Sequence, residues 1–295
     1  MPEAITVRVP ATSANLGPGF DCLGLALDLW GTLTFTFNQS SSATRTDPVA
    51  MMADIAFRRA FSETGRTPPP HLSVSYDGAV PVGRGLGVSA LSRVAGLIAA
   101  NAFHPEPLPP EHLLTLATDL EGHADNAAPA LFGGLQVVVR DGDEIKHIGA
   151  KVPPQLQVIL FIPHFNMPTE KSRRSLPTTV SLDDAVQNIG RAVLLVASLA
   201  SGRLDLLDAA SRDRLHQPTR SRIFPAMEAL FLAARESGAL CTFLSGAGST
   251  ICAFGTSRAE AIATAMAEAA SERNIAGETV ITTPSQRGGA ILDGS

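Results

Sequence analysis

Hydrophobic and polar residues alternate in several short segments, which is the pattern of half-buried β-strands. It is clearest at residues 5–9 and 33–37, and similar runs cover 71–76, 136–140, 156–162, 239–244 and 250–254. Helical patterns cover 51–61, 89–103, 111–120, 181–200, 225–237 and 257–272, and the second of these is apolar nearly all round, as in a buried helix. Strands and helices mix without a regular βαβ rhythm. The sequence therefore predicts an α+β fold in two lobes, divided near residue 150.

Two helix starts carry polar capping signals. Ser257 with Glu260 forms a capping box, and Ser181 with Asp184 is close to one, although Asp replaces the preferred Glu or Gln. Gly238 stands where a glycine usually ends a helix. These signals predict where three of the helices begin or end.

Composition excludes several classes of function. Of the 295 residues, 45% are hydrophobic, which is ample for a core, and the net charge of −5 gives no overall positive field to attract nucleic acid or anionic lipid. No uncharged apolar stretch is long enough to span a bilayer, and residues 1–4 do not resemble a signal peptide. The three cysteines form no CxxC, and the seven histidines form no HExxH. We expect a cytoplasmic protein with core cysteines and no structural metal.

The strongest local signal is PVGRGLGVSA at residues 81–90, where three glycines lead directly into the buried helix. Such a loop exposes backbone N–H groups beside the positive end of a helix dipole, which predicts a binding site for an anion. No GK[ST] follows, so it is not a Walker A loop. The loop matches GxGxxA, but the acidic residue required by the dinucleotide-binding fingerprint is missing. A purely structural glycine turn is the alternative.

Three further segments concentrate polar side chains and turn formers. TSANLGPGFD at residues 12–21 follows the first strand, EGHADN at 121–126 follows a helix, and LSGAGST at 244–250 forms a late glycine turn. Asx turns and helix caps account for any one of them alone. The four segments 12–21, 81–90, 121–126 and 244–250, taken together and in this order, form a pattern that is more specific than any one of them.

The chain resembles the GHMP kinases, and within them the homoserine kinases. The resemblance rests on residues 9–27, 81–90 and 244–250, with EGHADNAAPA from Glu121 and HQPTR from His216 specific to the second group. It implies two α+β lobes, at 1–150 and 151–295, the first of them the ATP-binding lobe, with the active site in the cleft between them. It also implies transfer of the ATP γ-phosphate to the side-chain hydroxyl of L-homoserine, in threonine biosynthesis.

The resemblance also implies roles for individual residues. The residues that it implies for nucleotide binding lie in the glycine loop and at the start of the following helix. They are Pro81, Val82, Gly83, Arg84, Gly85, Leu86, Gly87, Val88, Ser89, Ala90 and Leu91. The Mg²⁺ ligands that it implies are Ser89 and Asp119, with Glu121 as the alternative to Asp119. These side chains bind through oxygen, which suits Mg²⁺. The implied homoserine site comprises Asn15, Asp21, Thr169, Arg173 and Arg220. In it, the two arginines bind the carboxylate of homoserine and Asp21 binds its ammonium group. Asp125, His123 and Asn126 surround the reacting hydroxyl.

Three positions depart from the family pattern. Val88 replaces a serine of the phosphate loop, Ser249 replaces a proline, and residues 38–53 are shorter than the family's hairpin, with Pro48 in place of an asparagine near the adenine. The alternatives are therefore another GHMP kinase, of mevalonate or sugar type, and a relative that binds a metabolite without catalysis. The sequence does not determine the oligomeric state, and a homodimer remains an option.

Overall fold

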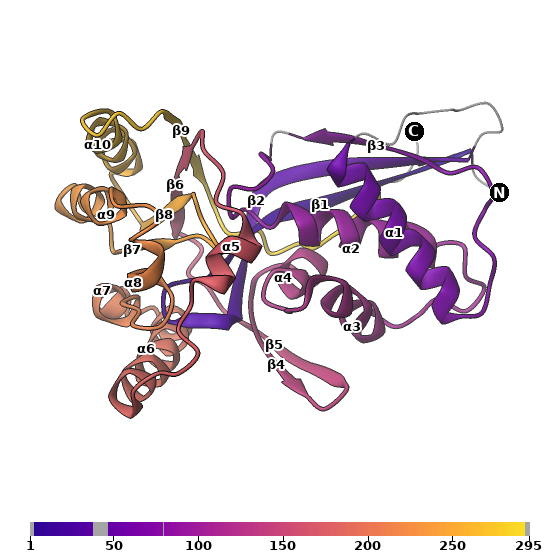
Figure 1. The fold of residues 1–295 in the computed structure, drawn as a ribbon, viewed down its shortest axis with the longest axis horizontal. Coiled ribbons are helices and arrows are strands. Elements are labelled where there is room, and N and C mark those ends of the chain that lie inside the picture. Colours follow the sequence, from indigo (N-terminus) through magenta and orange to yellow (C-terminus); the bar gives the residue numbers. More distant parts are fainter. Residues whose placement is uncertain (1–2, 38–46, 79, 293–295) are drawn as a thin grey trace.

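Two antiparallel sheets lie side by side in the computed structural model, which describes residues 3–37, 47–78 and 80–292, without the side chains of residues 169–171 (Figure 1). The first sheet has the strand order β10-β1-β2-β4-β5, and β3 also pairs with β2. Its strands are β1 (Ala4–Asn15), β2 (Gly19–Thr36), β3 (Ser73–Gly78), β4 (Leu135–Asp141), β5 (Glu144–Ala150) and β10 (Ala290–Leu292). The long β1 and β2 are its centre, and the polar segment 12–21 covers the end of β1, the turn and the start of β2.

Helices α1 (Pro48–Glu63), α2 (Val88–Asn101), α3 (Pro110–Glu121) and α4 (Ala127–Phe132) gather on one side of this sheet (Figure 1). The N-cap of α1 is Asp47, whose carboxylate accepts a hydrogen bond from the Val49 N–H, and Pro48 fits the first turn. As predicted, α2 is buried on most sides, because its apolar residues contact the sheet, α1 and α3. This burial fixes the direction in which the start of α2 points.

The second sheet has the strand order β7-β8-β6-β9, formed by β6 (Gln157–Pro163), β7 (Cys241–Leu244), β8 (Ile251–Gly255) and β9 (Gly277–Thr282). Around it lie α5 (Thr169–Arg174), α6 (Leu182–Ser201), a 3₁₀ turn (Leu204–Leu206), α7 (Leu207–Ala210), α8 (Gln217–Arg220), α9 (Met227–Glu236) and α10 (Ala259–Ser271). Helices α9 and α10 pack against each other and against this sheet. The predicted α+β class and two-lobed architecture are confirmed.

The chain does not divide cleanly at residue 150. β10 returns to the first lobe and pairs with β1, with Thr6 opposite Leu292, so the end of the described chain completes the first sheet. One hydrophobic cluster also runs through both lobes, from Val7 in β1 to Leu160 in β6 and Phe254 in β8. The predicted lobes at 1–150 and 151–295 therefore share a core, and the second contributes the strand β10 to the sheet of the first.

Several local expectations change in the structure. Ser181 caps α6 as predicted, accepting the Asp184 N–H at 3.0 Å. The capping box at Ser257 is wrong: the N-cap of α10 is Arg258, with a left-handed φ of 59° and no capping side chain. The sequence patterns also missed β5, β9, β10 and the short helices. These elements are exposed or short, so they carry little periodicity.

The cysteines are free, with Cys241 and Cys252 fully buried and Cys22 half-buried. Burial raises the pKa of the Cys22 thiol to about 11, which keeps it protonated. Among the described residues, no helix combines the length and apolar character needed to cross a membrane. The shortened hairpin noted in the sequence lies partly at residues 38–46, outside the described residues.

Candidate functional site

A cleft of about 400 Å³ lies between the two lobes and collects most of the segments singled out in the sequence. The glycine loop and the start of α2 form one wall, and the β1–β2 turn and residues 121–126 form another. Residues of α5, α8 and the 244–250 turn complete it from the second lobe. Its polar lining side chains are Asn15, Asp21, Ser89, Arg93, Glu121, His123, Asp125, Asn126, Arg173 and Arg220.

The start of α2 opens into this cleft. Its N-cap is Gly87, in the left-handed conformation with φ of 67°, and no side chain caps the helix. Val88, Ser89 and Ala90 line the cleft, and the first turn contains no acidic residue. An uncapped helix start with its partial positive charge turned toward a cleft is a binding site for an anion such as phosphate.

Close packing between loops holds the glycine loop in place. A Cβ at Gly87 would lie 1.8 Å from the Thr12 Oγ1, and one at Gly85 would lie 2.2 Å from the Ser245 carbonyl oxygen. The Thr12 hydroxyl donates to the Asn126 Oδ1 at 2.7 Å. The Ser245 hydroxyl lies 2.7 Å from the Gly85 carbonyl and 2.8 Å from the Ser13 hydroxyl. The four sequence segments therefore form one interlocked unit.

Ser89 and Glu121 form an oxygen-rich pair beside the helix start. The Ser89 hydroxyl donates to the Glu121 Oε1 at 2.5 Å, and the Arg93 guanidinium lies at the same distance from that oxygen. The Glu121 side chain is only 7% exposed. Ser89 and Arg93 therefore hold its carboxylate in a fixed position at the wall of the cleft.

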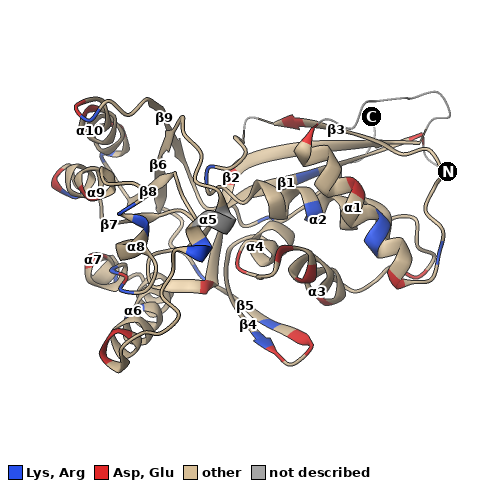
Figure 2. Ribbon diagram, in the orientation of Figure 1, with Lys and Arg blue, Asp and Glu red and all other residues tan. Residues whose placement is uncertain are grey.

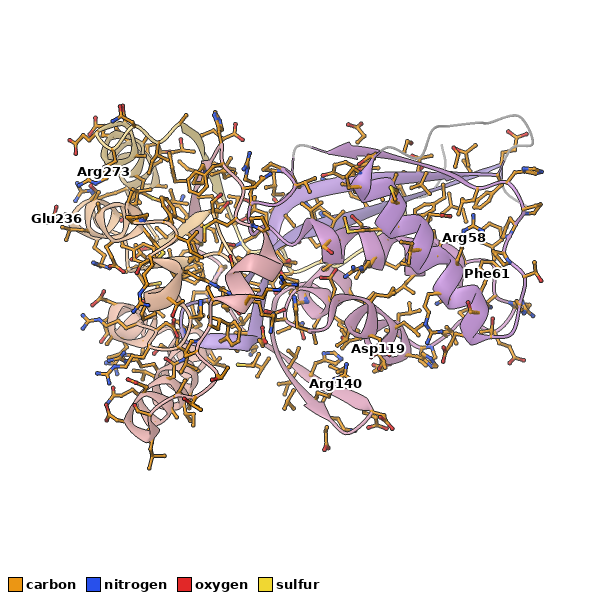
Figure 3. The ribbon with its side chains drawn as sticks, viewed as in Figure 1. Arg58, Phe61, Asp119, Arg140, Glu236 and Arg273 are labelled. Atoms are coloured by element: carbon orange, nitrogen blue, oxygen red, sulfur yellow. The ribbon has the colours of Figure 1, made fainter. Side chains whose placement is uncertain are left out.

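The prediction that Asp119 lies beside Ser89 is wrong. Asp119 is two residues before Glu121 on α3, and its side chain faces another direction, 46% exposed and 3.1 Å from the Arg140 guanidinium on β4 (Figure 3). It does not line the cleft. Side chains two positions apart on a helix point to different sides, so only one acid of this pair can face Ser89.

His123, Asp125 and Asn126 lie together, as the resemblance implies. Asp125 is buried, and its Oδ1 accepts from the Asn126 N–H at 2.9 Å and lies 2.5 Å from the His123 Nδ1. Burial lowers the pKa of His123, but the hydrogen bond and charge of Asp125 outweigh it, so the pKa is raised overall. Among the described residues, the Asp125 Oδ2 has no hydrogen-bond partner and remains available to a ligand.

Asp21 and Arg173 bind each other across the cleft. Both guanidinium NH groups of Arg173 reach the Asp21 carboxylate at 2.8 Å, and this bond raises the pKa of Arg173. Asn15 holds the turn in place, since its Oδ1 accepts the Asp21 N–H and its Nδ2 donates to the Gly246 carbonyl. Because Arg173 is 43% exposed, water screens the pair, and its net stabilisation is small.

Arg220 is the largest fully buried side chain of the described chain, at 2% exposure. Its guanidinium donates to the Gly246 carbonyl at 2.8 Å and to the His216 Nδ1 at 2.9 Å, and its Nε has no hydrogen-bond partner in the described part of the chain. Burial, followed by the charge of Arg173, lowers the pKa of Arg220 to about 10. A buried cation that lines a cleft and whose contacts with the described residues are to neutral groups is suited to bind an anionic ligand.

His216 orients Arg220. Its Nε2 lies 2.7 Å from the Gly17 carbonyl, which can only accept, so the proton is on Nε2 and Nδ1 accepts from Arg220. Burial lowers the pKa of His216 to about 4, so the ring is neutral at pH 7. The HQPTR string thus supplies both the cation and the group that directs it. Figure 2 shows basic residues on α5 and α8.

Not every predicted residue reaches the cleft. Leu91 is fully buried in the core, and Pro81 and Arg84 lie outside the lining. The Arg84 guanidinium instead binds the Asn166 side chain and the His164 carbonyl. The side chain of Thr169 lies outside the described residues.

Two functional candidates were missed in the sequence. Phe20 lies 5.4 Å from the Arg173 guanidinium and 5.6 Å from that of Arg220, so its ring contacts both cations. Arg93 is one helical turn after Ser89, a spacing that signals a shared face of α2 but not a function.

Two family models match more than half of the chain. Residues 50–134 match the family model "GHMP kinases N terminal domain", and residues 195–272 match "GHMP kinases C terminal". A homoserine kinase of Moorella thermoacetica is 43% identical over 79% of this chain and 81% of its own. One of a Synechococcus species is 42% identical over 79% and 80%.

Solved structures agree as well. The crystal structure of a homoserine kinase from Cytophaga hutchinsonii has a TM-score of 0.88 at 29% identity, covering 99% of this chain and 98% of that one. The mevalonate kinase of L. major, at 15% identity and a TM-score of 0.68 over 94% and 95%, shares the fold.

Gly87→Ala should destabilise the protein more than Gly65→Ala does. Both glycines have φ of 67°, but nothing lies within 4 Å of a Cβ at Gly65. We expect Gly65→Ala to lower the unfolding free energy by about 1–2 kcal/mol, the strain of a left-handed alanine. Gly87→Ala should cost about 1–3 kcal/mol more, from the clash with Thr12. Urea denaturation measures both, and equal losses would show that Thr12 does not constrain the loop.

Proposed function

Because the chain belongs to the homoserine kinases of the GHMP kinase family, we propose that its cleft binds ATP on the glycine loop and homoserine between Asp21, Arg173 and Arg220. The enzyme phosphorylates homoserine with ATP, a reaction of threonine biosynthesis. The γ-phosphoryl group moves to the side-chain oxygen, the hydroxyl proton leaves, and ADP is the second product. Phosphoryl transfer depends mainly on positioning and on stabilising charge, which is what these residues offer.

The observation that carries the homoserine site is the charge arrangement around Phe20. An α-amino acid brings one carboxylate and one ammonium. Among the described residues, Arg220 is a buried cation without a carboxylate partner, and the Arg173 guanidinium and the Asp21 carboxylate form an ion pair with each other. A bound amino acid replaces that ion pair, its carboxylate bridging the two arginines and its ammonium taking the Asp21 carboxylate. A planar guanidinium fork suits the carboxylate geometry.

Asp125 is the group we propose for the reacting hydroxyl. Its Oδ1 accepts from His123 and Asn126, which leaves Oδ2 to accept a hydrogen bond from the substrate hydroxyl and to hold its proton. Because the transition state is loose and dissociative, this carboxylate contributes chiefly by orienting the attacking oxygen. His123 and Asn126 fix the carboxylate in turn.

Ser89 and Glu121 fit an Mg²⁺ ion that would accompany the nucleotide. A hydroxyl and a carboxylate oxygen beside a phosphate-binding helix start are hard ligands of the kind Mg²⁺ takes, with the rest supplied by phosphates and water. When bound there, the ion neutralises phosphate charge. Arg93 holds the Glu121 carboxylate in position. Among the described residues, no cluster of three or more His, Cys, Asp or Glu side chains could hold a metal, so Mg²⁺ would need the phosphates.

The wild-type enzyme should release ADP with homoserine but not with mevalonate or galactose.

Removing Arg173 or Arg220, the two arginines proposed to bind the substrate carboxylate, should weaken homoserine binding. Arg173→Ala and Arg220→Lys should raise the KM for homoserine by about 10–100-fold, since a hydrogen bond to a charged group contributes about 1.5–3 kcal/mol. Arg174→Ala, an exposed neighbour on α5 outside the cleft lining, is the control. Unchanged KM values in both clamp variants would contradict the carboxylate assignment.

Glu121→Gln should reduce turnover strongly, and Asp119→Asn should not. Glutamine keeps the shape of the side chain but loses the charge, so we expect kcat to fall by roughly 100-fold and the Mg²⁺ requirement to rise. The exposed Asp119 supplies the matched control two residues away. Steady-state rates across an Mg²⁺ titration measure both effects. A normal Glu121→Gln enzyme with an inactive Asp119→Asn enzyme would reverse the assignment.

Asp125→Asn should lower kcat by up to about 10²–10⁴-fold, the range of a general base, with little change in the homoserine KM. It should also lower the pKa of His123, because the carboxylate that raises this pKa is neutralised while burial remains. An NMR titration of the His123 ring detects that shift without relying on activity. An unaltered kcat would remove Asp125 from the reacting hydroxyl and leave His123 as the next candidate.

A further inference from the structure

The glycine loop and α2, residues 81–101, offer few side-chain donors to a phosphate. They contain no lysine, and the basic residue of the loop, Arg84, binds a neighbouring segment outside the cleft lining. Val88 has an aliphatic side chain, and the Ser89 hydroxyl donates to Glu121. The start of a helix carries only a partial positive charge, about half an elementary charge. A triphosphate therefore needs a further cation on this wall of the cleft.

Arg93 is the basic residue of α2, and it lines the cleft (Figure 2). It follows Ser89 by four residues, so the two side chains share one face of the helix. Side chains on a helix lean toward its N-terminus, which directs the long Arg93 side chain back toward the start of α2. Its NH1 lies 2.5 Å from the Glu121 Oε1, the same oxygen that accepts from the Ser89 hydroxyl. The guanidinium therefore lies beside the phosphate-binding end of the helix.

Glu121 occupies only part of the Arg93 guanidinium. Among the residues that the structure describes, Glu121 is the ionic partner of Arg93, and the contact is made through one nitrogen. A guanidinium carries five N–H donors, so donors remain for a second partner. The Arg93 side chain is 20% exposed and lines the cleft, which leaves it accessible to a ligand there. The other arginines of the lining, Arg173 and Arg220, come from the second lobe and are proposed to bind the homoserine carboxylate.

From this arrangement we propose that Arg93 binds a phosphate oxygen of the nucleotide directly while it holds Glu121. The inference rests on the proposed binding of ATP at the glycine loop and adds a residue to that site. A planar guanidinium can direct some of its N–H groups at a carboxylate and others at a phosphate. Its charge also offsets that of Glu121, which would otherwise repel the phosphates at short range. Arg93 thus allows a carboxylate and an anionic substrate to share one wall of the cleft.

Binding of ATP in EDTA, measured by isothermal titration calorimetry of the full chain, tests this contact without Mg²⁺ and without turnover. Because the loss of Arg93 alone would leave the Glu121 charge unpaired, the comparison is made between Glu121→Gln chains with and without a second substitution. Adding Arg93→Gln should raise the Kd for ATP by about 10–100-fold, the range expected for a hydrogen bond to a charged group. Equal Kd values for the single and the double variant would overturn the proposal.

A lysine at position 93 separates the effect of charge from that of a changed side chain. In the Glu121→Gln background, Arg93→Lys keeps a positive charge and should bind ATP several-fold more tightly than Arg93→Gln does. A thermal melt of each variant shows whether it is folded before the titration. Equal ATP affinities of the folded lysine and glutamine variants would also contradict a phosphate contact.

Arg140→Gln is the matched control. Arg140 also binds an acidic residue of α3, since its guanidinium lies 3.1 Å from the Asp119 carboxylate, but it lies outside the cleft lining. The control should leave the Kd for ATP unchanged, and a loss as large as that from Arg93→Gln would show a general effect of charge and overturn the direct contact. A wild-type chain that binds ATP neither in EDTA nor with Mg²⁺ would contradict the proposed nucleotide site as a whole. ATP binding that is indifferent to residue 93 would contradict only the role of Arg93.

Discussion

The site depends on backbone segments that approach more closely than any side chain would allow. The Gly85 backbone lies against the Ser245 carbonyl, and that of Gly87 lies against the Thr12 side chain. Ser245 then ties Gly85 to Ser13, and Thr12 ties the loop to Asn126. Because these contacts join both lobes, they fix the start of α2, residues 121–126 and the β1–β2 turn relative to one another. Catalysis by positioning requires this rigidity.

Around this rigid unit, charge is arranged unevenly. The cations Arg173 and Arg220 lie on the second lobe, and the carboxylates Asp21, Glu121 and Asp125 lie on the first. Only Asp21 and Arg173 are joined directly, and that pair is partly exposed and screened by water. In the proposed homoserine complex, the exchange of this pair for a zwitterion would involve a small change in free energy, and the buried Arg220 would gain a carboxylate partner. Neutral His216 makes this possible because a protonated ring would repel the guanidinium.

The sequence motifs predicted which segments meet at the cleft better than periodicity predicted the strands. Motif residues such as Asn15, His123, Asp125 and Arg220 do converge on one cleft, because their segments are distinctive as strings. To choose between Asp119 and Glu121, one must know which side of α3 faces the cleft. A short sequence motif does not give that information. Arg93 and Phe20 gave no chemical signal of their own. The helices with strong periodicity were found, whereas β5 was missed because it is largely exposed. β10 was missed because it has three residues and pairs with β1, which is distant in the sequence.

The return of the chain to its first sheet bears on how the protein acquires its structure during synthesis. β1 leaves the ribosome early, yet one of its two neighbours, β10, is made after every other described element. Until then one edge of β1 presents unpaired N–H and C=O groups, which are a template for pairing with other chains. The same late pairing closes a very long loop, and such contacts slow folding. The first lobe therefore has an open strand edge until the last described strand of the chain has been made.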